Sequence, residues 1–134
     1  MPVTQQELWL TAAPTELAET RRLADEAGAT YGLNGDERFA FTFAVNEAVS
    51  NAIEHGSPSP DATVHVRFTA ERDALVCCVR DFGEFTPKPP MGDELGTRVR
   101  GLAFMAAMVD RIDLCRGSTG TLVRLSKRRV PSPC

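Results

Sequence analysis

Three side chains capable of acid–base or metal chemistry recur every four residues in the first half of the chain. They are Glu47, Asn51 and His55, and a spacing of four places them along one face of an α-helix. Apolar residues occupy the other faces of this stretch: Val45, Ala48, Val49 and Ala52. Burying an unpaired carboxylate or amide is costly, so such a stripe should face either solvent or a ligand. Spacing alone leaves both interpretations open.

A second polar position follows an apolar strand. Asp81 and Gly83 come directly after residues 74–80, most of which are apolar. An aspartate at that place can accept a hydrogen bond from an exocyclic amine, and a glycine lets the backbone approach a ring closely. An ordinary β-turn after a strand is the alternative interpretation of the same two residues.

Two further segments contain glycine where an element is expected to begin. Residues 96–102 contain two glycines and run into a helix, whose free amides and positive dipole end would suit a phosphate. Residues 120–125 begin with Gly-Thr and continue as an apolar strand. A glycine-containing helix start and a plain hairpin strand are the alternative interpretations.

The elements that position these residues follow from hydrophobic periodicity. Helical spacing predicts helices over residues 15–31, 37–55 and 101–110, with the turn at 34–36 able to cap the second. Two-residue alternation predicts strands over 5–11, 63–68, 74–80, 111–115 and 121–127. Residues 81–98 are rich in glycine and proline and predict a long loop. This order favours an α+β sandwich with one antiparallel-rich sheet and all helices on one face, because a doubly wound parallel sheet needs strand–helix–strand alternation.

Size and composition indicate one domain. The chain has 134 residues, 43% of them apolar, which is enough for a single hydrophobic core. Fifteen basic and eighteen acidic residues give a net charge of −3, which argues against binding nucleic-acid phosphates as the main activity. No apolar run approaches the roughly 20 residues that span a bilayer, and the first ten residues lack the pattern of a signal peptide. The four cysteines form no Cys-x-x-Cys pair, which favours free thiols in a cytoplasmic protein. The charge and the lack of a long apolar run lead us to expect no direct nucleic-acid or membrane partner.

Taken in order, these segments resemble the GHKL ATP-binding fold, which is shared by histidine kinases, gyrase-type ATPases and anti-sigma factor serine kinases. Residues 46–56, Asn46-Glu47-Ala48-Val49-Ser50-Asn51-Ala52-Ile53-Glu54-His55-Gly56, look like the N-box of the anti-sigma group. The resemblance extends from about Leu8 to Lys127 and implies a single histidine-kinase-like ATPase domain over 1–134, with 128–134 as a frayed tail. It implies a two-layer α/β sandwich of the Bergerat type, with a mixed, mostly antiparallel sheet and helices on one face. ATP would lie between the helices and a mobile lid.

The resemblance also implies roles at the phosphate end of ATP. Asn51 would hold Mg²⁺, an ion that commonly keeps several waters and takes further ligands from phosphate oxygens. Glu47 would be the general base that takes a proton from the attacking hydroxyl. His55 could help to close this end, or could simply be a histidine at a helix C-terminus. Three residues would close the lid over the phosphates: Arg100, Gly101 and Leu102.

At the adenine end, the resemblance implies that Asp81 accepts a hydrogen bond from the amino group. Gly83 would pack against the base, and Thr121 would support it through a water. Two places depart from the family pattern. Phe85 stands where a second glycine is common, and residues 98–99 are Arg-Val where the family has glycine, which stiffens the phosphate loop.

The implied function is that of an ATP-dependent serine/threonine protein kinase acting as an anti-sigma regulatory factor. Such a protein sequesters a sigma factor and phosphorylates a STAS-type anti-anti-sigma partner on serine. The alternative, favoured by the altered glycines, is a nucleotide-gated anti-sigma binding module without kinase activity, and a third hypothesis is a degenerate fold that binds no nucleotide. The resemblance leaves homodimer formation open, together with the identity of the sigma factor, the partner and the triggering signal.

Overall fold

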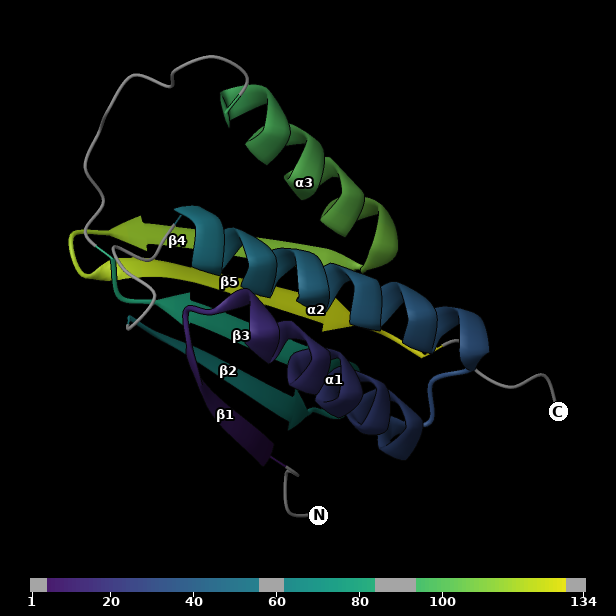
Figure 1. Ribbon diagram of the computed structural model, residues 1–134. Helices are drawn as coiled ribbons and strands as arrows, with labels where there is room; N and C mark the ends of the chain where they lie inside the picture. The colour runs from purple at the N-terminus through teal and green to yellow at the C-terminus, as the bar shows by residue number, and fades with distance from the viewer. Residues whose placement is uncertain (1–4, 56–61, 84–93, 130–134) are drawn as a thin grey trace, which may run out of the picture.

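All strand pairings in the described chain belong to one antiparallel sheet. The computed structural model describes residues 5–55, 62–83 and 94–129, with only the backbone described at 55 and 94–100. The strands are β1 (Gln5–Thr11), β2 (Thr63–Ala70), β3 (Leu75–Asp81), β4 (Arg111–Gly117) and β5 (Gly120–Lys127). Their order is β1-β2-β3-β5-β4 (Figure 1). The predicted antiparallel character is confirmed, whereas the expected mixture with parallel pairing is wrong for these strands, since all four pairings are antiparallel.

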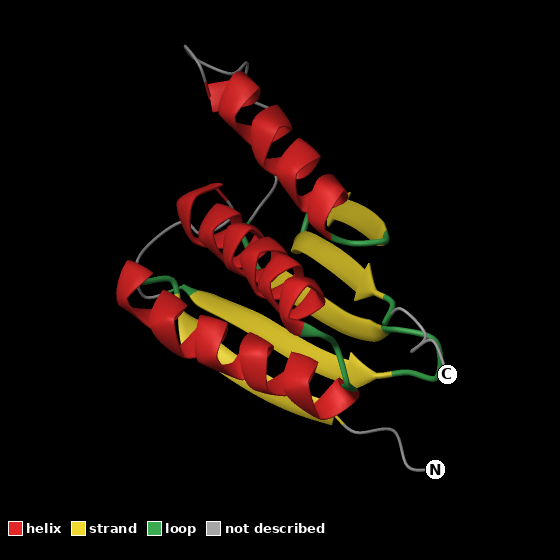
Figure 2. Ribbon diagram, turned by 90° about the vertical axis from the view of Figure 1, so that its right-hand side faces the viewer, coloured by secondary structure: helices red, strands yellow, loops and turns green. Residues whose placement is uncertain are grey.

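The helices lie together on one face of this sheet, as Figure 2 shows. They are α1 (Leu17–Tyr31), which follows a short 3₁₀ turn at Pro14–Glu16, α2 (Gly35–His55) and α3 (Glu94–Met108). This arrangement confirms the predicted two-layer α+β sandwich. Within the described residues, none of the helices is both long and apolar enough to span a membrane.

The core fills the space between the two layers. Its central side chains are fully buried and come from α2 and from the helix-facing side of the sheet: Phe41, Val45, Val49, Val64, Val66 and Leu125. In β2, burial follows every second residue, because successive side chains of a strand point to opposite faces of the sheet. The alternation that predicted the strand therefore also identifies its buried side.

The start of α2 is closed by two reciprocal hydrogen bonds. The Glu37 amide donates to Asn34 Oδ1 at 2.8 Å, and the Asn34 amide donates to the Glu37 carboxylate at 2.8 Å. Such a pair satisfies amides that a helix N-terminus otherwise leaves free. The predicted cap is confirmed, and α2 begins at Gly35, two residues earlier than its apolar spacing predicted.

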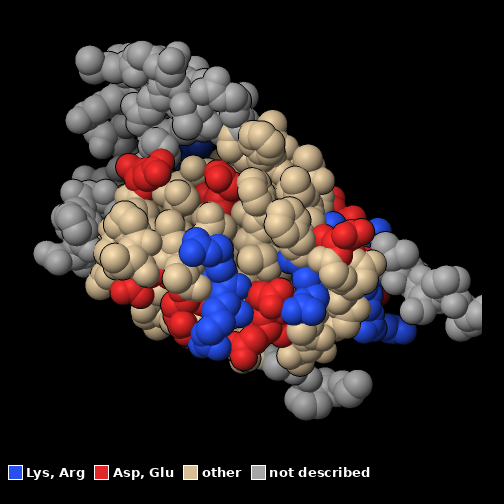
Figure 3. All heavy atoms as spheres, turned by 45° about the vertical axis from the view of Figure 1, so that its right-hand side comes forward, with Lys and Arg blue, Asp and Glu red and all other residues tan. Residues whose placement is uncertain are grey.

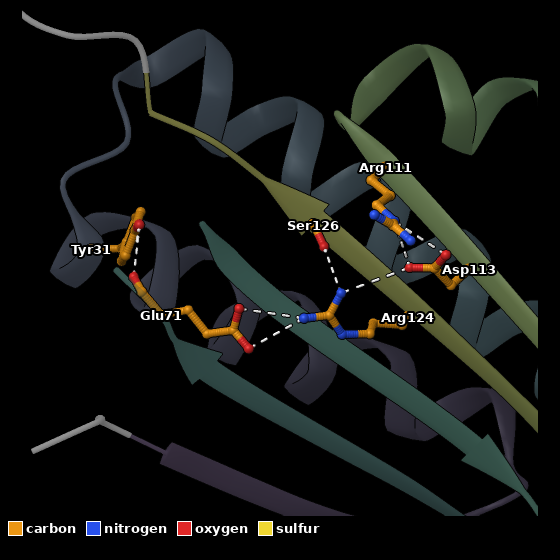
Figure 4. A network of polar contacts seen from close by, with 6 residues as sticks. All are labelled: Tyr31, Glu71, Arg111, Asp113, Arg124 and Ser126. Carbon is orange, nitrogen blue, oxygen red and sulfur yellow. Dashed lines mark hydrogen bonds and ion pairs between the residues drawn. The ribbon is translucent and has the colours of Figure 1, made fainter. Parts of the chain in front are cut away.

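The face of the sheet away from the helices carries a chain of ion pairs (Figure 4). The Arg124 guanidinium on β5 donates to the two carboxylate oxygens of Glu71 at 3.2 and 3.3 Å, and lies 3.7 Å from the Asp113 carboxylate on β4. Asp113 also accepts a hydrogen bond from Arg111 at 2.9 Å. The Tyr31 hydroxyl donates to the Glu71 carbonyl at 3.0 Å. Together these contacts join the end of α1, the β2–β3 turn and the β4–β5 hairpin.

Charges over the helical layer are interleaved. Arg22 on α1 pairs with Glu19 at 2.6 Å and with Glu26 at 2.7 Å, and Arg38 on α2 pairs with Asp25 at 2.7 Å. Figure 3 shows basic and acidic side chains next to one another on the face that it draws. These arginines are thus neutralised by neighbouring acids rather than gathered into a basic stripe.

The described cysteines are free thiols: Cys77, Cys78 and Cys115. Cys134 lies outside the described residues. Cys77 is fully buried in β3, and burial raises the pKa of its thiol well above the ordinary value. A thiol held in its neutral form in the core is a packing residue and not a nucleophile.

Candidate functional site

The polar stripe of α2 lies directly against α3. A Cβ atom placed on Gly101 of α3 would lie 3.3 Å from Asn51 Nδ2 and 3.6 Å from Glu47 Oε2. Glu47 and Asn51 are half-buried. We call these three residues, Glu47, Asn51 and Gly101, the α2–α3 junction. The interpretation of the stripe as a plain solvent-facing surface is therefore wrong at these positions, because a second helix partly covers them.

The polar groups of the α2–α3 junction are the Glu47 carboxylate and the Asn51 carboxamide. Among the described residues, neither Glu47 nor Asn51 has a hydrogen-bond or ion-pair partner. A half-buried carboxylate or carboxamide that lacks a protein partner is stabilised when a ligand or an ion binds to it. The described residues contain no cluster of three or more metal-ligating His, Cys, Asp or Glu side chains. A hard cation at Asn51 would thus take most of its oxygen ligands from water and from a bound anion, which is the usual situation for Mg²⁺.

Asp81 ends β3 with its side chain on the helix-facing side of the sheet. It is only 5% exposed, and its Oδ1 accepts hydrogen bonds from the amides of Gly83 at 3.3 Å and Thr121 at 3.2 Å. Burial raises the pKa of Asp81 above its ordinary value, while the two amides act in the opposite direction by stabilising the charged form. Among the described residues, Oδ2 accepts no hydrogen bond, so the carboxylate keeps an acceptor for a ligand amine. We call Asp81, Gly83 and Thr121 the β3 terminus.

The β4–β5 hairpin holds the β3 terminus in place. Gly120 has a φ of +133°, and a Cβ atom there would overlap the main-chain carbonyl of Asp81. Only glycine meets both conditions without strain. The next residue, Thr121, stands opposite Asp81 in the strand register, and its amide donates to the carboxylate. The structure therefore brings Thr121 to Asp81 through its main chain.

The other predicted site residues divide between these two places. Gly83 is half-buried at the β3 terminus. Leu102 packs against the core from α3, next to the α2–α3 junction. His55 and Arg100 lie within α2 and α3, but their side chains fall outside the described part of the chain, as does all of Phe85.

The predicted start of the third helix is wrong. α3 begins at Glu94, so the predicted loop over 81–98 includes helical residues, and Gly101 is the eighth residue of the helix. The amides around Gly101 therefore lie inside the helix and not at its N-terminus, where they would have been free for a phosphate. A glycine in a helix costs about 1 kcal/mol, and burial of apolar residues later in α3 offsets this cost. Gly101 instead permits close approach of α3 to the polar side chains of α2.

Sequence reasoning did not assign Gly120 to the site. The available signal was its place after Ser118-Thr119 in the tight connection between two strands. Such hairpin connections favour glycine, because positive φ angles are required there. The close approach to the Asp81 carbonyl depends on the pairing of β5 with β3, which the sequence pattern does not specify.

Comparisons with known proteins agree with this architecture. The family model described as the histidine kinase-like ATPase domain matches residues 10–127. A crystal structure of the RsbU and RsbW domains of Rv1364c from Mycobacterium tuberculosis is similar with a TM-score of 0.71 and 23% identity, over 95% of this chain and 33% of that chain. The histidine kinase domain from the Erythrobacter litoralis EL346 blue-light activated histidine kinase has a TM-score of 0.56 and 20% identity, over 84% of this chain and 60% of that chain. At these identities the likeness is one of fold, and no protein with a curated description has a significantly similar sequence.

Proposed function

Because this chain belongs to the histidine kinase-like ATPase family, we propose that it binds ATP with Mg²⁺ and transfers the γ-phosphoryl group to a serine or threonine of a protein partner. The observation that carries the proposal is the approach of Gly101 to Glu47 and Asn51, whose side chains have no polar partner within the part of the chain that the structure describes. Phosphoryl transfer needs mainly positioning and neutralisation of charge. At the junction, Glu47 and Asn51 would serve positioning, and Mg²⁺ held by Asn51 would supply the neutralisation.

Adenine recognition would depend on the β3 terminus. The amides of Gly83 and Thr121 fix Asp81 Oδ1, which leaves Oδ2 to accept a hydrogen bond from the adenine amino group. Hypoxanthine and guanine carry a carbonyl oxygen in place of the adenine amino group. This oxygen and Asp81 Oδ2 are both hydrogen-bond acceptors, so they would repel each other. Asp81 would therefore favour adenine over hypoxanthine or guanine.

The residues of the α2–α3 junction would act at the phosphate end. Asn51 would contribute one oxygen ligand to Mg²⁺, which when bound neutralises phosphate charge. Glu47, one helical turn earlier, would accept the proton of the attacking hydroxyl. Arg100, Gly101 and Leu102 would cover the phosphates from α3.

Exposed aromatic side chains beside Glu47 support a protein as the phosphate acceptor. Phe43 lies one turn before Glu47 on α2, and Phe104 lies one turn after Gly101 on α3. Their ring centroids are 6.3 Å apart, and the side chains are 36% and 55% exposed. Exposed apolar surface is typical of places where another protein docks. A partner bound there would bring its hydroxyl group close to Glu47.

The class of partner that we propose is the STAS-type anti-anti-sigma protein, with a sigma factor as the second partner. The support is the N-box-like sequence at residues 46–56 and a fold shared with a structure that includes an RsbW domain. Phosphorylation adds about −1.5 to −2 charges to the acceptor and would break its interface with this chain. Release of the phosphorylated partner would then leave the chain free to sequester the sigma factor.

Transfer to a partner tests the kinase proposal directly. The chain is incubated with Mg²⁺ and ATP labelled in the γ-phosphate, together with STAS proteins encoded in the same genome. We expect label on a serine of one of them. Tight ATP binding without transfer to any of them would contradict the kinase proposal.

One observation favours the alternative, a nucleotide-gated binding module. Residues 98–99 are Arg-Val where the family has glycine, and α3 is continuously helical through them. A stiff helix closes over phosphates less readily than a glycine loop. In this alternative, ATP changes the affinity for the sigma factor in a pull-down experiment, although no phosphate is transferred.

Replacing Asn51 with Ala should remove the part of the ATP affinity that depends on magnesium. We expect the Kd for Mg-ATP to rise roughly tenfold, the effect of losing one contact worth about 1.4 kcal/mol, while the Kd measured in EDTA changes little. Isothermal titration with and without Mg²⁺ measures both values. Asn46→Ala is the matched control, because the Asn46 side chain accepts a hydrogen bond from Arg21 on α1 at 3.0 Å. An unchanged magnesium dependence in Asn51→Ala would contradict this role.

A further inference from the structure

A cluster of aromatic side chains lies on the face of the sheet away from the helices, next to the β3 terminus. Trp9 on β1 stacks on Phe82, with ring centroids 6.0 Å apart and an interplanar angle of 13°. The ring centroids of Trp9 and of His65 on β2 are 4.2 Å apart. The Arg80 guanidinium carbon lies 5.1 Å from the centroid of the Phe82 ring. We call Trp9, His65, Arg80 and Phe82 the outer aromatic cluster.

The strand register explains how the outer aromatic cluster reaches Asp81. Trp9 pairs with His65, and His65 pairs with Arg80, so these three residues form one row across β1, β2 and β3. Asp81 lies between Arg80 and Phe82 in the sequence. Successive residues of a strand point to opposite faces, so both neighbours of Asp81 are held on the outer face while its carboxylate points inward.

We propose that Trp9 is a positioning residue for nucleotide recognition, an inference that rests on the proposed function. By stacking on Phe82, Trp9 fixes the backbone that connects Asp81 to Gly83. That backbone determines whether the Gly83 amide reaches Asp81 Oδ1, and hence where Oδ2 points. Trp9 thereby sets the preference for adenine from the opposite side of the sheet, without touching the nucleotide.

The exposure of the stack separates this role from ordinary core packing. Trp9 is 60% exposed and Phe82 is 45% exposed, so their contact buries little apolar surface. Loss of the Trp9 ring therefore removes a local restraint on the β3 terminus rather than a part of the core. The expected effect falls on discrimination between bases, more than on the stability of the fold.

The test compares affinities for ATP and inosine triphosphate, whose base carries a carbonyl oxygen in place of the adenine amino group. Wild type should prefer ATP, and Asp81→Asn should lose that preference, because an amide can also donate to a carbonyl. In Trp9→Ala we expect ATP affinity to fall roughly 3- to 10-fold, the range of one aromatic pair, with a smaller change for inosine triphosphate. Trp9→Phe should restore most of the preference. The matched control is Leu114→Ala, which removes an exposed apolar side chain from the opposite edge strand.

The outcomes separate this inference from the proposed function. If wild type binds neither nucleotide or does not distinguish them, the proposed adenine site is wrong and the role of Trp9 falls with it. If wild type prefers ATP and Trp9→Ala keeps the same ratio of affinities, only the role of Trp9 is overturned. Equal losses for both nucleotides with a lowered Tm would also overturn it, since they indicate a merely structural residue. If Trp9→Ala does not fold, Phe82→Leu removes the other ring of the same stack. The ratio of its affinities for ATP and inosine triphosphate then gives the answer, and an unchanged ratio would overturn the role of the stack.

Discussion

Phosphate transfer by Glu47→Gln should be slower than wild type by about 10²- to 10⁴-fold, the usual contribution of a general base. Glutamine has nearly the same shape as glutamate, so the close approach of Gly101 to position 47 should survive. ATP affinity should therefore change little. Single-turnover transfer to the partner protein, measured beside ATP binding by titration, separates these two quantities.

The matched control for Glu47→Gln is Asp36→Asn, which neutralises an exposed acid at the far end of the same helix. It should transfer phosphate at the wild-type rate. Wild-type transfer by Glu47→Gln itself would show that the proton goes elsewhere, and the general-base role would be wrong. A parallel loss of transfer and of ATP binding would instead indicate a role for Glu47 in holding the nucleotide.

Gly120→Ala should destabilise the fold more than a typical substitution. The residue has a φ of +133°, and its new methyl group would overlap the Asp81 carbonyl, so β5 must move away from β3. Strain of this kind costs on the order of 1–3 kcal/mol, and displacement of the Thr121 amide from Asp81 adds to it. We expect Tm to fall by roughly ten degrees, measured by thermal unfolding.

Gly117→Ala provides the control for this substitution within the same turn. A Cβ atom at Gly117 meets nothing within 4 Å, and its φ is not positive. Its Tm should stay close to that of wild type. If Gly120→Ala unfolds at the same temperature as Gly117→Ala, the close approach of Gly120 to the Asp81 carbonyl does not restrain the hairpin.

The sequence predicted those parts of the fold that depend on local periodicity. Alternation identified β2 and its buried side, and the spacing of four identified the polar stripe with Glu47 and Asn51. The turn at residues 34–36 could be predicted to cap α2 because capping is a contact between near neighbours, and the structure assigns the cap to Asn34. In each case the interactions that decide the structure lie within one or two turns of the chain.

The parts that could not be predicted depend on contacts between distant segments. Glycine at position 96 indicates a loop when read locally, and glycine at position 101 indicates a helix start, whereas α3 runs through both positions because it packs on α2. The contact of Gly120 with Asp81 requires β5 to lie beside β3, and the stack of Trp9 on Phe82 requires β1 and β3 to flank β2. Strand order is a property of the whole sheet, and alternation within single strands does not specify it.

The long sequence separation between Asp81 and the groups that hold it has a consequence for biosynthesis. The Thr121 amide lies 40 residues after the carboxylate that it binds, and closing a segment of that length costs entropy before any contact forms. A nascent chain that has emerged only as far as β4 therefore still lacks one of the two amide donors. Under the proposed function, affinity for adenine would develop late in translation, when β5 joins the sheet. Binding of the nucleotide would then stabilise finished chains over incomplete ones by mass action.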